Sequence, residues 1–590
     1  MKQFFKFMFA SALGTILVIV LLLLFMFASL AAVVSSVNTS TPNIRSKSVL
    51  YLDFKKPVYD RQVENLSMLG SSSTSSIGMY ELIKMIETAK TDDNIKGIYL
   101  DLSYIQANGW ATIEEIRNAL LDFKESKKFI YAYGDMYMQN AYYLSTVADK
   151  IGMNPAGHLV LQGLGAEVVY LKDLLDKFDV NVDLIRPKNN AYKSAGEMFL
   201  LNKMSNANRE QIRTYISSIW NHVSQQMATE RGIDFDTLQK RVDNLDGFMA
   251  EDALRARFVD TLCFESDMHM LIKQKIGADK DDKINFVSYK QYKDYLALNP
   301  QNKNKSKNAI AVIYAYGSVE QGKGSDLVIG SETIAKAIRK AAAKDNVKAI
   351  VLRVNSGGGD AIASEIMTHE IVKAKQKKPV IVSMGDVAAS AGYEIASNAT
   401  KIVALPTTIT GSIGVFGVMP EFGTALKKHL GIFFDTVGTN ANSHFFSTMR
   451  PMKAQAREVM QRNVEEFYVN FCHRVSIGRN LSMDFVDSIA RGRVWSGADA
   501  KKIGLIDEFG GLISAINLAA KEAKTDDYKV VSMPAVKTMQ QQIMELISDD
   551  GETLVSMKMK EKPYRWLLEM ESWTKMSGVQ ARLPYIISLN

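Results

Sequence analysis

The sequence of 590 residues has only two cysteines, Cys263 and Cys472, and seven histidines. Two cysteines exclude a disulfide-stabilised scaffold and a zinc site built from thiolates. No two histidines stand in HxH or HxxxH spacing, the patterns that place two imidazoles on one metal. The 71 basic residues barely exceed the 64 acidic ones and form no long run, which gives no sign of nucleic-acid binding. We therefore expect no metal, no cofactor and no nucleic-acid partner.

One long hydrophobic run stands at the N-terminus. Residues 7–34 carry no charge and are rich in Leu, Val, Ile and Phe. About 20 apolar residues span a bilayer as a helix, whereas the apolar part of a signal peptide has about 7–15. Lys2 and Lys6 precede the run, and basic residues favour the cytoplasmic side. We predict a single-pass anchor in residues 1–37 with a cytoplasmic N-terminus and the body across the membrane, in a bacterium the periplasm. The small residues 28–32 leave cleavage as an alternative.

The remaining chain contains an internal duplication. Residues 77–102 align without gaps on residues 329–354, with about 10 of the 26 positions identical. Continuous apolar strands alternate with helical patterns, which predicts an α/β fold with a parallel sheet in each copy. In the second copy, for example, the strand predicted at 349–354 is followed by a helix at 361–375. The boundaries that we predict are a first repeat at 47–298, a linker at 299–308, a second repeat at 309–535 and a C-terminal tail at 536–590 without a usable motif.

The two copies differ after corresponding strands. The second copy has NSGGGD at 355–360, where the first has SYIQAN at 103–108. Glycines after a buried strand allow main-chain N–H groups to face a developing oxyanion, although the same run can be a simple strand-to-helix turn. A few residues later the second copy has Ser390 where the first has Gln139. A serine among small residues that opens a helix suits a nucleophile, or alternatively a helix cap.

A nucleophilic serine needs a base, and the sequence offers no histidine for this role. No histidine occurs between Ser390 and His429, so no Ser-His-Asp triad is apparent. A lysine can replace histidine when burial lowers the pKa of its amine. The second copy lacks lysine between residues 428 and 453, whereas the first copy has Lys188 and Lys193 in the matching region. Most lysines are solvated surface residues, so the pattern alone selects neither.

These motifs resemble the bacterial signal peptide peptidase A family of serine proteases, peptidase family S49, in its long, duplicated form. The similarity rests on NSGGGDAIASE at 355–365, GDVAASAGYEIAS at 385–397, TGSIGVFG at 410–417 and YKSAGEMF at 192–199. It implies tandem domains with the fold shared by Clp protease and crotonase. By motif, the implied site residues are the nucleophile Ser390, the general base Lys193, the lysine-orienting Ser412, and the oxyanion donors Gly359 and Ala391, with Gly358 as the neighbouring alternative. The family commonly has proline where Gly357 stands, which leaves the choice between the two glycines open.

The resemblance implies a function as well. It predicts an endopeptidase of the bacterial inner membrane that degrades signal peptides after their release from preproteins, acting as a homo-oligomer, most simply a tetramer. Hydrophobic peptides and the membrane are then its partners. Two alternatives are a crotonase-type acyl-CoA enzyme, which shares the glycine turn, and a catalytically inactive membrane scaffold.

Overall fold

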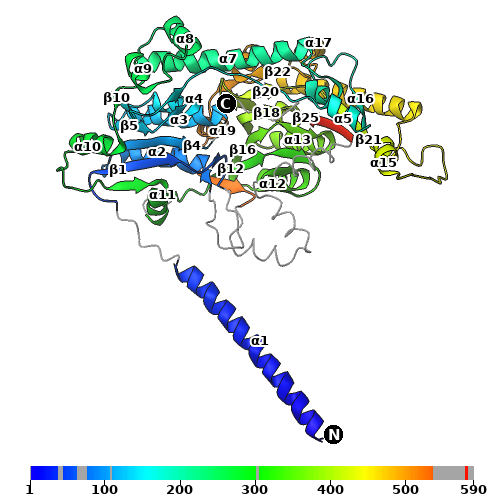
Figure 1. Ribbon diagram of the computed structural model, residues 1–590, viewed down its shortest axis with the longest axis horizontal. Helices are drawn as coiled ribbons and strands as arrows, with labels where there is room; N and C mark the ends of the chain where they lie inside the picture. The colour runs from blue at the N-terminus through cyan, green and yellow to red at the C-terminus, as the bar shows by residue number, and fades with distance from the viewer. Residues whose placement is uncertain are drawn as a thin grey trace.

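The computed structural model describes residues 2–36, 44–62, 76–106, 109–299, 304–535 and 578–582. Part of the predicted linker, residues 300–303, and most of the predicted tail therefore lie outside the described residues. Two large sheets stand side by side in the body with helices packed around them (Figure 1), and further sheets complete it.

The first sheet has six parallel strands in the order β10-β7-β5-β4-β1-β11. Its strands β4 and β5 are nearly continuous runs of buried residues, as expected for a parallel sheet covered on both faces. The bounds are β1 Ser48–Phe54, β4 Ile95–Ile105, β5 Phe129–Gly134, β7 Lys150–Met153, β10 Thr261–Leu262 and β11 Phe286–Ser288. Its helices include α2 Met79–Thr91, α3 Trp110–Lys124, α4 Gln139–Ser145, α10 Glu265–Ile276 and α11 Tyr289–Leu298.

The second sheet repeats this strand order. Its path β19-β18-β16-β12-β24 corresponds to β7-β5-β4-β1-β11, and β20 and β22 extend it beyond β18. The bounds are β12 Ala309–Tyr316, β16 Val347–Ser356, β18 Val380–Ala389, β19 Lys401–Ala404, β20 Ile409–Gly411, β22 Val494–Ser496, β23 Glu508–Phe509 and β24 Lys529–Met533. Its helices include α12 Ser331–Ala343, α13 Ala361–Lys375, α14 Ala391–Ser397 and α19 Leu512–Glu522. The predicted α/β architecture with parallel strands is therefore confirmed.

A third sheet combines both repeats. Its order is β14-β15-β13-β17-β25-β21-β9, in which β9 comes from the first repeat and β25 from the C-terminal tail. The bounds are β9 Asn181–Ile185, β13 Ser318–Glu320, β14 Gly324–Ser325, β15 Val328–Gly330, β17 Gly358–Asp360, β21 Phe416–Glu421 and β25 Gly578–Arg582. Short pairs β2 Val58–Tyr59 with β3 Ile77–Gly78, and β6 Tyr137–Met138 with β8 Leu159–Val160, complete the strands.

The long helix α7 (Asn206–Arg231) also joins the two repeats. It belongs to the first repeat but packs against β22 of the second, and it runs across the top of the body in Figure 1. The main core of the first repeat accordingly contains Ala389, Ile409 and Val494 from the second. The repeats thus form one packed unit, and a site can take residues from both. The other helical segments are α5 Lys172–Lys177, η1 Ser194–Gly196, α6 Glu197–Leu200, α8 Phe235–Asp243, α9 Ala250–Arg255, α15 Gly423–Leu430, α16 Ala454–Arg479, α17 Met483–Ile489 and α18 Gly497–Lys502.

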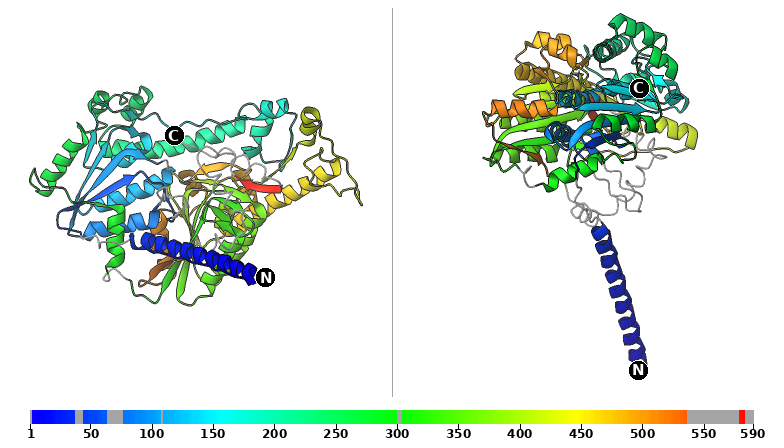
Figure 2. Two further views of the ribbon diagram at one scale, coloured as in Figure 1. Left: turned by 60° about the horizontal axis from the view of Figure 1, so that its bottom comes forward. Right: turned by 90° about the vertical axis from the view of Figure 1, so that its left-hand side faces the viewer.

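The N-terminal helix α1 (Lys2–Ser36) extends away from the body in Figure 1 and in the right-hand view of Figure 2. Within the described ranges, no helix is long and apolar enough to cross a membrane. The anchor predicted for residues 1–37 therefore remains a prediction.

Candidate active site

Lys193 and Ser390 lie in direct contact although 197 positions separate them in the chain. The Lys193 amine Nζ is 2.7 Å from the Ser390 hydroxyl Oγ. Lys193 precedes η1 in the first repeat, and Ser390 joins β18 to α14 in the second. The sequence alone shows no reason why these two segments should meet. The packing of the repeats brings them together.

Burial determines the protonation state of the lysine. The Lys193 and Ser390 side chains are both 0% exposed. Burial lowers the pKa of Lys193 well below its ordinary value, because an ammonium ion is poorly solvated in the interior. The amine is therefore closer to a neutral base at physiological pH than a surface lysine would be. Lys188, the other candidate base, is exposed and lies outside this contact.

Two oxygen atoms of Ser412 contact the Lys193 amine. Lys193 Nζ lies 3.1 Å from the main-chain oxygen of Ser412 and 3.0 Å from its hydroxyl Oγ. A neutral amine has two N–H donors and one lone pair. If the two donors are used on Ser412, the lone pair faces the hydroxyl of Ser390, as proton abstraction requires.

Both serines occupy turns with positive φ. Ser390 has φ +57° and ψ −122°, and Ser412 has φ +51°. A non-glycine residue in such a region costs about 1–3 kcal/mol and persists only where its surroundings impose it. The Ser390 N–H donates to the Gly411 carbonyl at 2.8 Å, and the Ser412 N–H donates to the Arg493 carbonyl at 2.7 Å. Such imposed strain is typical of a functional turn.

Gly392, the small residue after Ala391, allows close packing behind Ser390. A Cβ atom on Gly392 would lie 2.7 Å from the carbonyl oxygen of Ser356, at the end of β16. The first turn of α14 can therefore approach the strand that leads to the glycines. This explains why small residues follow Ser390 in the sequence.

The glycines of the second repeat lie on β17, against which α14 packs. Gly358 has φ +103°, which favours glycine, and its N–H donates to Ser356 Oγ at 3.1 Å. Gly359 is buried, and a Cβ there would lie 2.1 Å from the Val319 carbonyl oxygen on β13. Gly359 is itself paired in the sheet, with Val319 on one side and Ala581 on the other. Gly359 and Gly358 therefore both remain candidates for the second oxyanion donor besides Ala391.

Several residues that hold Lys193 were missed by the sequence analysis. Gln211 on α7 donates to the Tyr192 carbonyl at 2.9 Å, and its Oε1 accepts from the Val494 N–H at 3.1 Å. Gly492 lies so close that a Cβ there would be 2.5 Å from the Lys193 main-chain nitrogen. In the sequence, Gln211 stands only as one polar residue of a long polar helix, and Gly492 as a glycine between two arginines. Neither pattern indicates a contact with Lys193, which is 299 positions away from Gly492.

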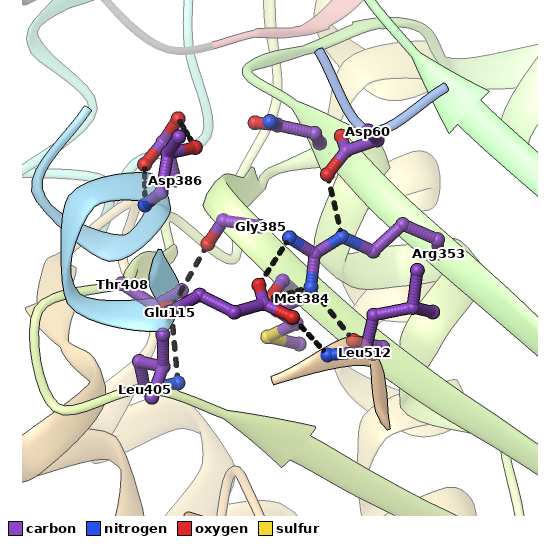
Figure 3. Close-up of polar contacts among 12 residues, drawn as sticks. Asp60, Glu115, Arg353, Met384, Gly385, Asp386, Leu405, Thr408 and Leu512 are labelled. Carbon is purple, nitrogen blue, oxygen red and sulfur yellow. Dashed lines mark hydrogen bonds and ion pairs between the residues drawn. The ribbon is translucent and has the colours of Figure 1, made fainter. Parts of the chain in front are cut away.

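A buried ionic cluster holds the repeats together beneath this site. Arg353 on β16 contacts Asp60 at 2.7 Å and Glu115 on α3 at 2.8 Å, and it donates to the Met384 carbonyl on β18 at 3.1 Å (Figure 3). Burial alone would lower the pKa of Arg353, but the two carboxylates raise it above its ordinary value. Since β18 ends beside Ser390, these contacts attach the first repeat to the strand that leads to Ser390.

The helix α3 makes a second contact of this kind. Its Thr112 donates twice to Asp386 on β18, from the main-chain N–H and from the hydroxyl, each at 2.7 Å. Burial raises the pKa of Asp386, whereas the hydrogen bonds from Thr112 lower it. Asp386 lies four residues before Ser390, so these two hydrogen bonds also hold the segment that leads to Ser390 against the first repeat.

Comparison with known proteins agrees with the sequence motifs. A profile described as "Peptidase family S49" matches the chain twice, at residues 122–279 and 372–526. "Protease 4" of Haemophilus influenzae is 33% identical over 542 residues, covering 88% of this chain and 85% of that protein. "Protease 4" of Salmonella typhi is 34% identical over 504 residues, covering 82% and 80%. The predicted duplication and family are thereby confirmed.

A solved structure with similarity to the chain is that of the 1510-N membrane-bound stomatin-specific protease in complex with a substrate peptide. It is 17% identical, has a TM-score of 0.27, and the match covers 41% of this chain and 99% of that one.

Proposed function

The chain belongs to peptidase family S49 and is a serine protease, and on this premise we propose that Ser390 and Lys193 form its catalytic dyad. The observation that carries the proposal is the 2.7 Å contact between a fully buried amine and the serine hydroxyl. Membership in a peptidase family does not fit a crotonase-type acyl-CoA enzyme. An inactive scaffold would have no use for a buried lysine that is aimed at a strained serine and whose hydrogen-bond partners within the described ranges are all uncharged.

The proposed reaction begins with Ser390. Its Oγ attacks the substrate carbonyl carbon while its proton moves to Lys193 Nζ. The N–H groups of Ala391 and of Gly359 or Gly358 hold the oxyanion of the tetrahedral intermediate. Lys193 then protonates the leaving amine, the peptide C–N bond breaks, and the acyl group stays on Ser390 as an ester. A water molecule, deprotonated by the same amine, hydrolyses this ester and restores the serine.

We propose that the substrates are cleaved signal peptides, as the resemblance to the signal peptide peptidase A family implies. An extended peptide can pair through its main chain with the glycine strand, which gives affinity with little side-chain selection. This suits a degradative endopeptidase whose substrates share hydrophobicity rather than a sequence.

The cellular setting is part of the proposal. The uncharged run at residues 7–34 supports a single-pass anchor in the bacterial inner membrane, with the N-terminus in the cytoplasm and the body in the periplasm. A homotetramer is the assembly that the resemblance implies. Membrane fractionation with protease protection tests the topology, and cross-linking in detergent tests the assembly.

Hydrolysis of a hydrophobic peptide ester, combined with fluorophosphonate labelling, tests the activity. We expect wild type to turn over and to label, Ser390→Ala to do neither, and Lys193→Ala to lose about 10²–10⁴ in rate. Lys188→Ala is the matched control, since this exposed lysine should leave the rate unchanged. Normal turnover in Lys193→Ala would show that the base is another residue.

A further inference from the structure

Arg493 stands at the boundary between the repeats, beside the turn that carries the proposed base. It belongs to the second repeat and directly precedes β22, which packs against α7 of the first repeat (Figure 1). Its guanidinium carbon lies over the ring of Tyr192, 4.8 Å from the ring centroid, and over the ring of Trp495 at 4.6 Å. Tyr192 directly precedes Lys193 in the first repeat, whereas Trp495 lies on β22. One side chain therefore contacts both repeats next to the residue that carries the amine.

The main chain of the same segment contacts both residues that place the amine. The Arg493 carbonyl accepts from the Ser412 N–H at 2.7 Å, and the Arg491 carbonyl accepts from the Tyr192 N–H at 3.0 Å. Ser412 in turn contacts Lys193 Nζ through its main-chain oxygen and its hydroxyl. A stretch of three residues in the second repeat is thus bonded to the lysine turn and to Ser412.

The Trp495 ring is held in place by the second repeat. Its Nε1–H donates to the Ile489 carbonyl at 3.0 Å, and β22 pairs with β20. A Cβ on Gly411 would lie 2.7 Å from this ring, so β20 packs closely against it. Since β20 leads to Ser412, the side chain of Arg493 connects the lysine turn to the strand before Ser412 by a second route.

The ring contacts of Arg493 outweigh its ion pair. Its Nη2 lies 3.1 Å from Glu210 on α7, but the Glu210 side chain is 55% exposed, and an exposed pair contributes little. The arginine side chain is only 20% exposed, and a cation held over aromatic rings away from water contributes more. A flat guanidinium stacks on a ring in a way that the compact ammonium of lysine cannot. The shape of this side chain should therefore matter, and not only its charge.

We propose that Arg493 is a positioning residue for Lys193. Its contacts with the rings of Tyr192 and Trp495 hold the lysine turn where the amine reaches Ser390. This inference rests on the proposed function, since it concerns the base of the same site. Loss of the ring contacts leaves the buried ionic cluster between the repeats intact but allows the lysine turn to move. A small displacement of a reacting group is enough to slow a reaction strongly, and water that reaches the amine favours its charged form.

Arg493→Lys in the full-length protein tests the proposal, because it keeps the charge and removes the flat guanidinium. The matched control is Arg491→Lys, two residues away, where the arginine side chain pairs with Asp487 at 2.8 Å. The kcat and KM for a hydrophobic peptide and the rate of fluorophosphonate labelling are measured over a range of pH. Thermal unfolding of each variant verifies that it is folded.

We expect Arg493→Lys to lower kcat and the labelling rate about tenfold, with KM changed less than about twofold. The pH midpoint of kcat/KM should move upward, because a looser turn admits water to the amine. Arg491→Lys should match wild type in both respects. Equal kcat and equal midpoints in the two variants would overturn the proposal. A fall in kcat without movement of the midpoint would overturn it as well, since loosened packing alone produces that result.

Tyr192→Leu removes the other half of the contact and keeps the test decisive if the arginine variant folds poorly. It should lower kcat about as much as Arg493→Lys, and the double variant should lose little more, because both changes break one contact. Tyr192→Phe keeps the ring and should lose clearly less than Tyr192→Leu. Equal losses in the two tyrosine variants, or additive losses in the double variant, would overturn the proposal. If wild type itself neither hydrolyses peptide nor labels, the proposed function fails, and this inference fails with it.

Discussion

The two repeats build the same strand order and then diverge at the ends of two corresponding strands. β5 ends at Gly134 and the chain continues to Gln139 at the start of α4, whereas β18 continues to Ala389 and leads to Ser390. The extended part of β18 pairs with β20, which precedes Ser412. The first repeat has the counterpart of this pairing in β6 with β8, but with neither serine.

The lysine shows the opposite distribution. The first repeat supplies Lys193, and the second has no lysine between residues 428 and 453. A duplicated pair therefore divides the proposed site between its halves, with the proposed nucleophile on one and the proposed base on the other. The packing of one repeat on the other sets the distance between Lys193 Nζ and Ser390 Oγ. Catalysis by the proposed dyad therefore depends on that packing.

The largest expected effect is loss of the serine. Ser390→Ala should reduce peptide hydrolysis to background and abolish fluorophosphonate labelling, because the Ser390 hydroxyl is the group proposed to form the acyl-enzyme. The converse substitution, Gln139→Ser, places a serine at the matching position of the first repeat, where no buried lysine amine is available. Gln139→Ser should therefore not restore peptide hydrolysis to the Ser390→Ala variant. Hydrolysis by the double variant would mean that either repeat can supply the nucleophile.

The next effect concerns Lys193. Lys193→Met should lower kcat by about 10²–10⁴ at neutral pH, because methionine keeps the volume but cannot accept a proton. In wild type, kcat/KM should rise with pH through the lowered pKa of this amine and then level off. The residual activity of the methionine variant should lack that titration. Identical pH profiles would assign the titration to another group.

Lys193 also predicts how stability depends on pH. Its folded pKa is lowered, so between that value and the ordinary lysine value of about 10.4 the unfolded chain binds one proton more than the folded one. In that window, the free energy of unfolding of wild type minus that of Lys193→Met should therefore increase by about 1.4 kcal/mol for each unit that the pH rises. Denaturant titrations of both proteins at several pH values measure the difference. A constant difference would show that the folded amine stays protonated.

Much of this arrangement could be predicted from the sequence. The alignment of residues 77–102 with 329–354 predicts the repeated α/β units, and the helix expected at 361–375 is observed at Ala361–Lys375. The motif resemblance selected Ser390 and Lys193 among the 590 residues. Their 2.7 Å contact could not be predicted, because it results from packing between repeats and leaves no periodicity in either segment. The contact of Gly492 with Lys193 could not be predicted for the same reason. The strand β25 could not be predicted either, because its five residues have no strand-forming pattern of their own.

The docking of the repeats can be tested at Arg353. Arg353→Met leaves the carboxylates of Asp60 and Glu115 buried without their cation, which should cost about 3–5 kcal/mol of unfolding free energy. Arg339→Met is the matched control in the same repeat, because its pair with Glu370 has a 57% exposed arginine and should contribute under about 1 kcal/mol. Chemical denaturation gives both values. Equal losses would show that the buried cluster does not hold the repeats together.

The smallest effect, and the sharpest test of the divided site, is expected at Gly492. It has φ +79°, and a Cβ there would lie 2.5 Å from Lys193. Gly492→Ala should move the lysine away from Ser390 and lower kcat by about 10²-fold, since a shift of about 1 Å is enough for such a loss.

Gly232→Ala separates this displacement from simple backbone strain. Gly232 has a similar φ of +57°, but a Cβ there would meet only the end of the Arg257 side chain, at 3.7 Å. Both variants should lose about 1 kcal/mol of stability from the left-handed backbone, and only Gly492→Ala should also lose turnover. If the two variants lose activity equally, the rate does not depend on the position of Lys193. If kcat falls only in Gly492→Ala, a methyl group added to the second repeat has moved the proposed base of the first repeat out of position.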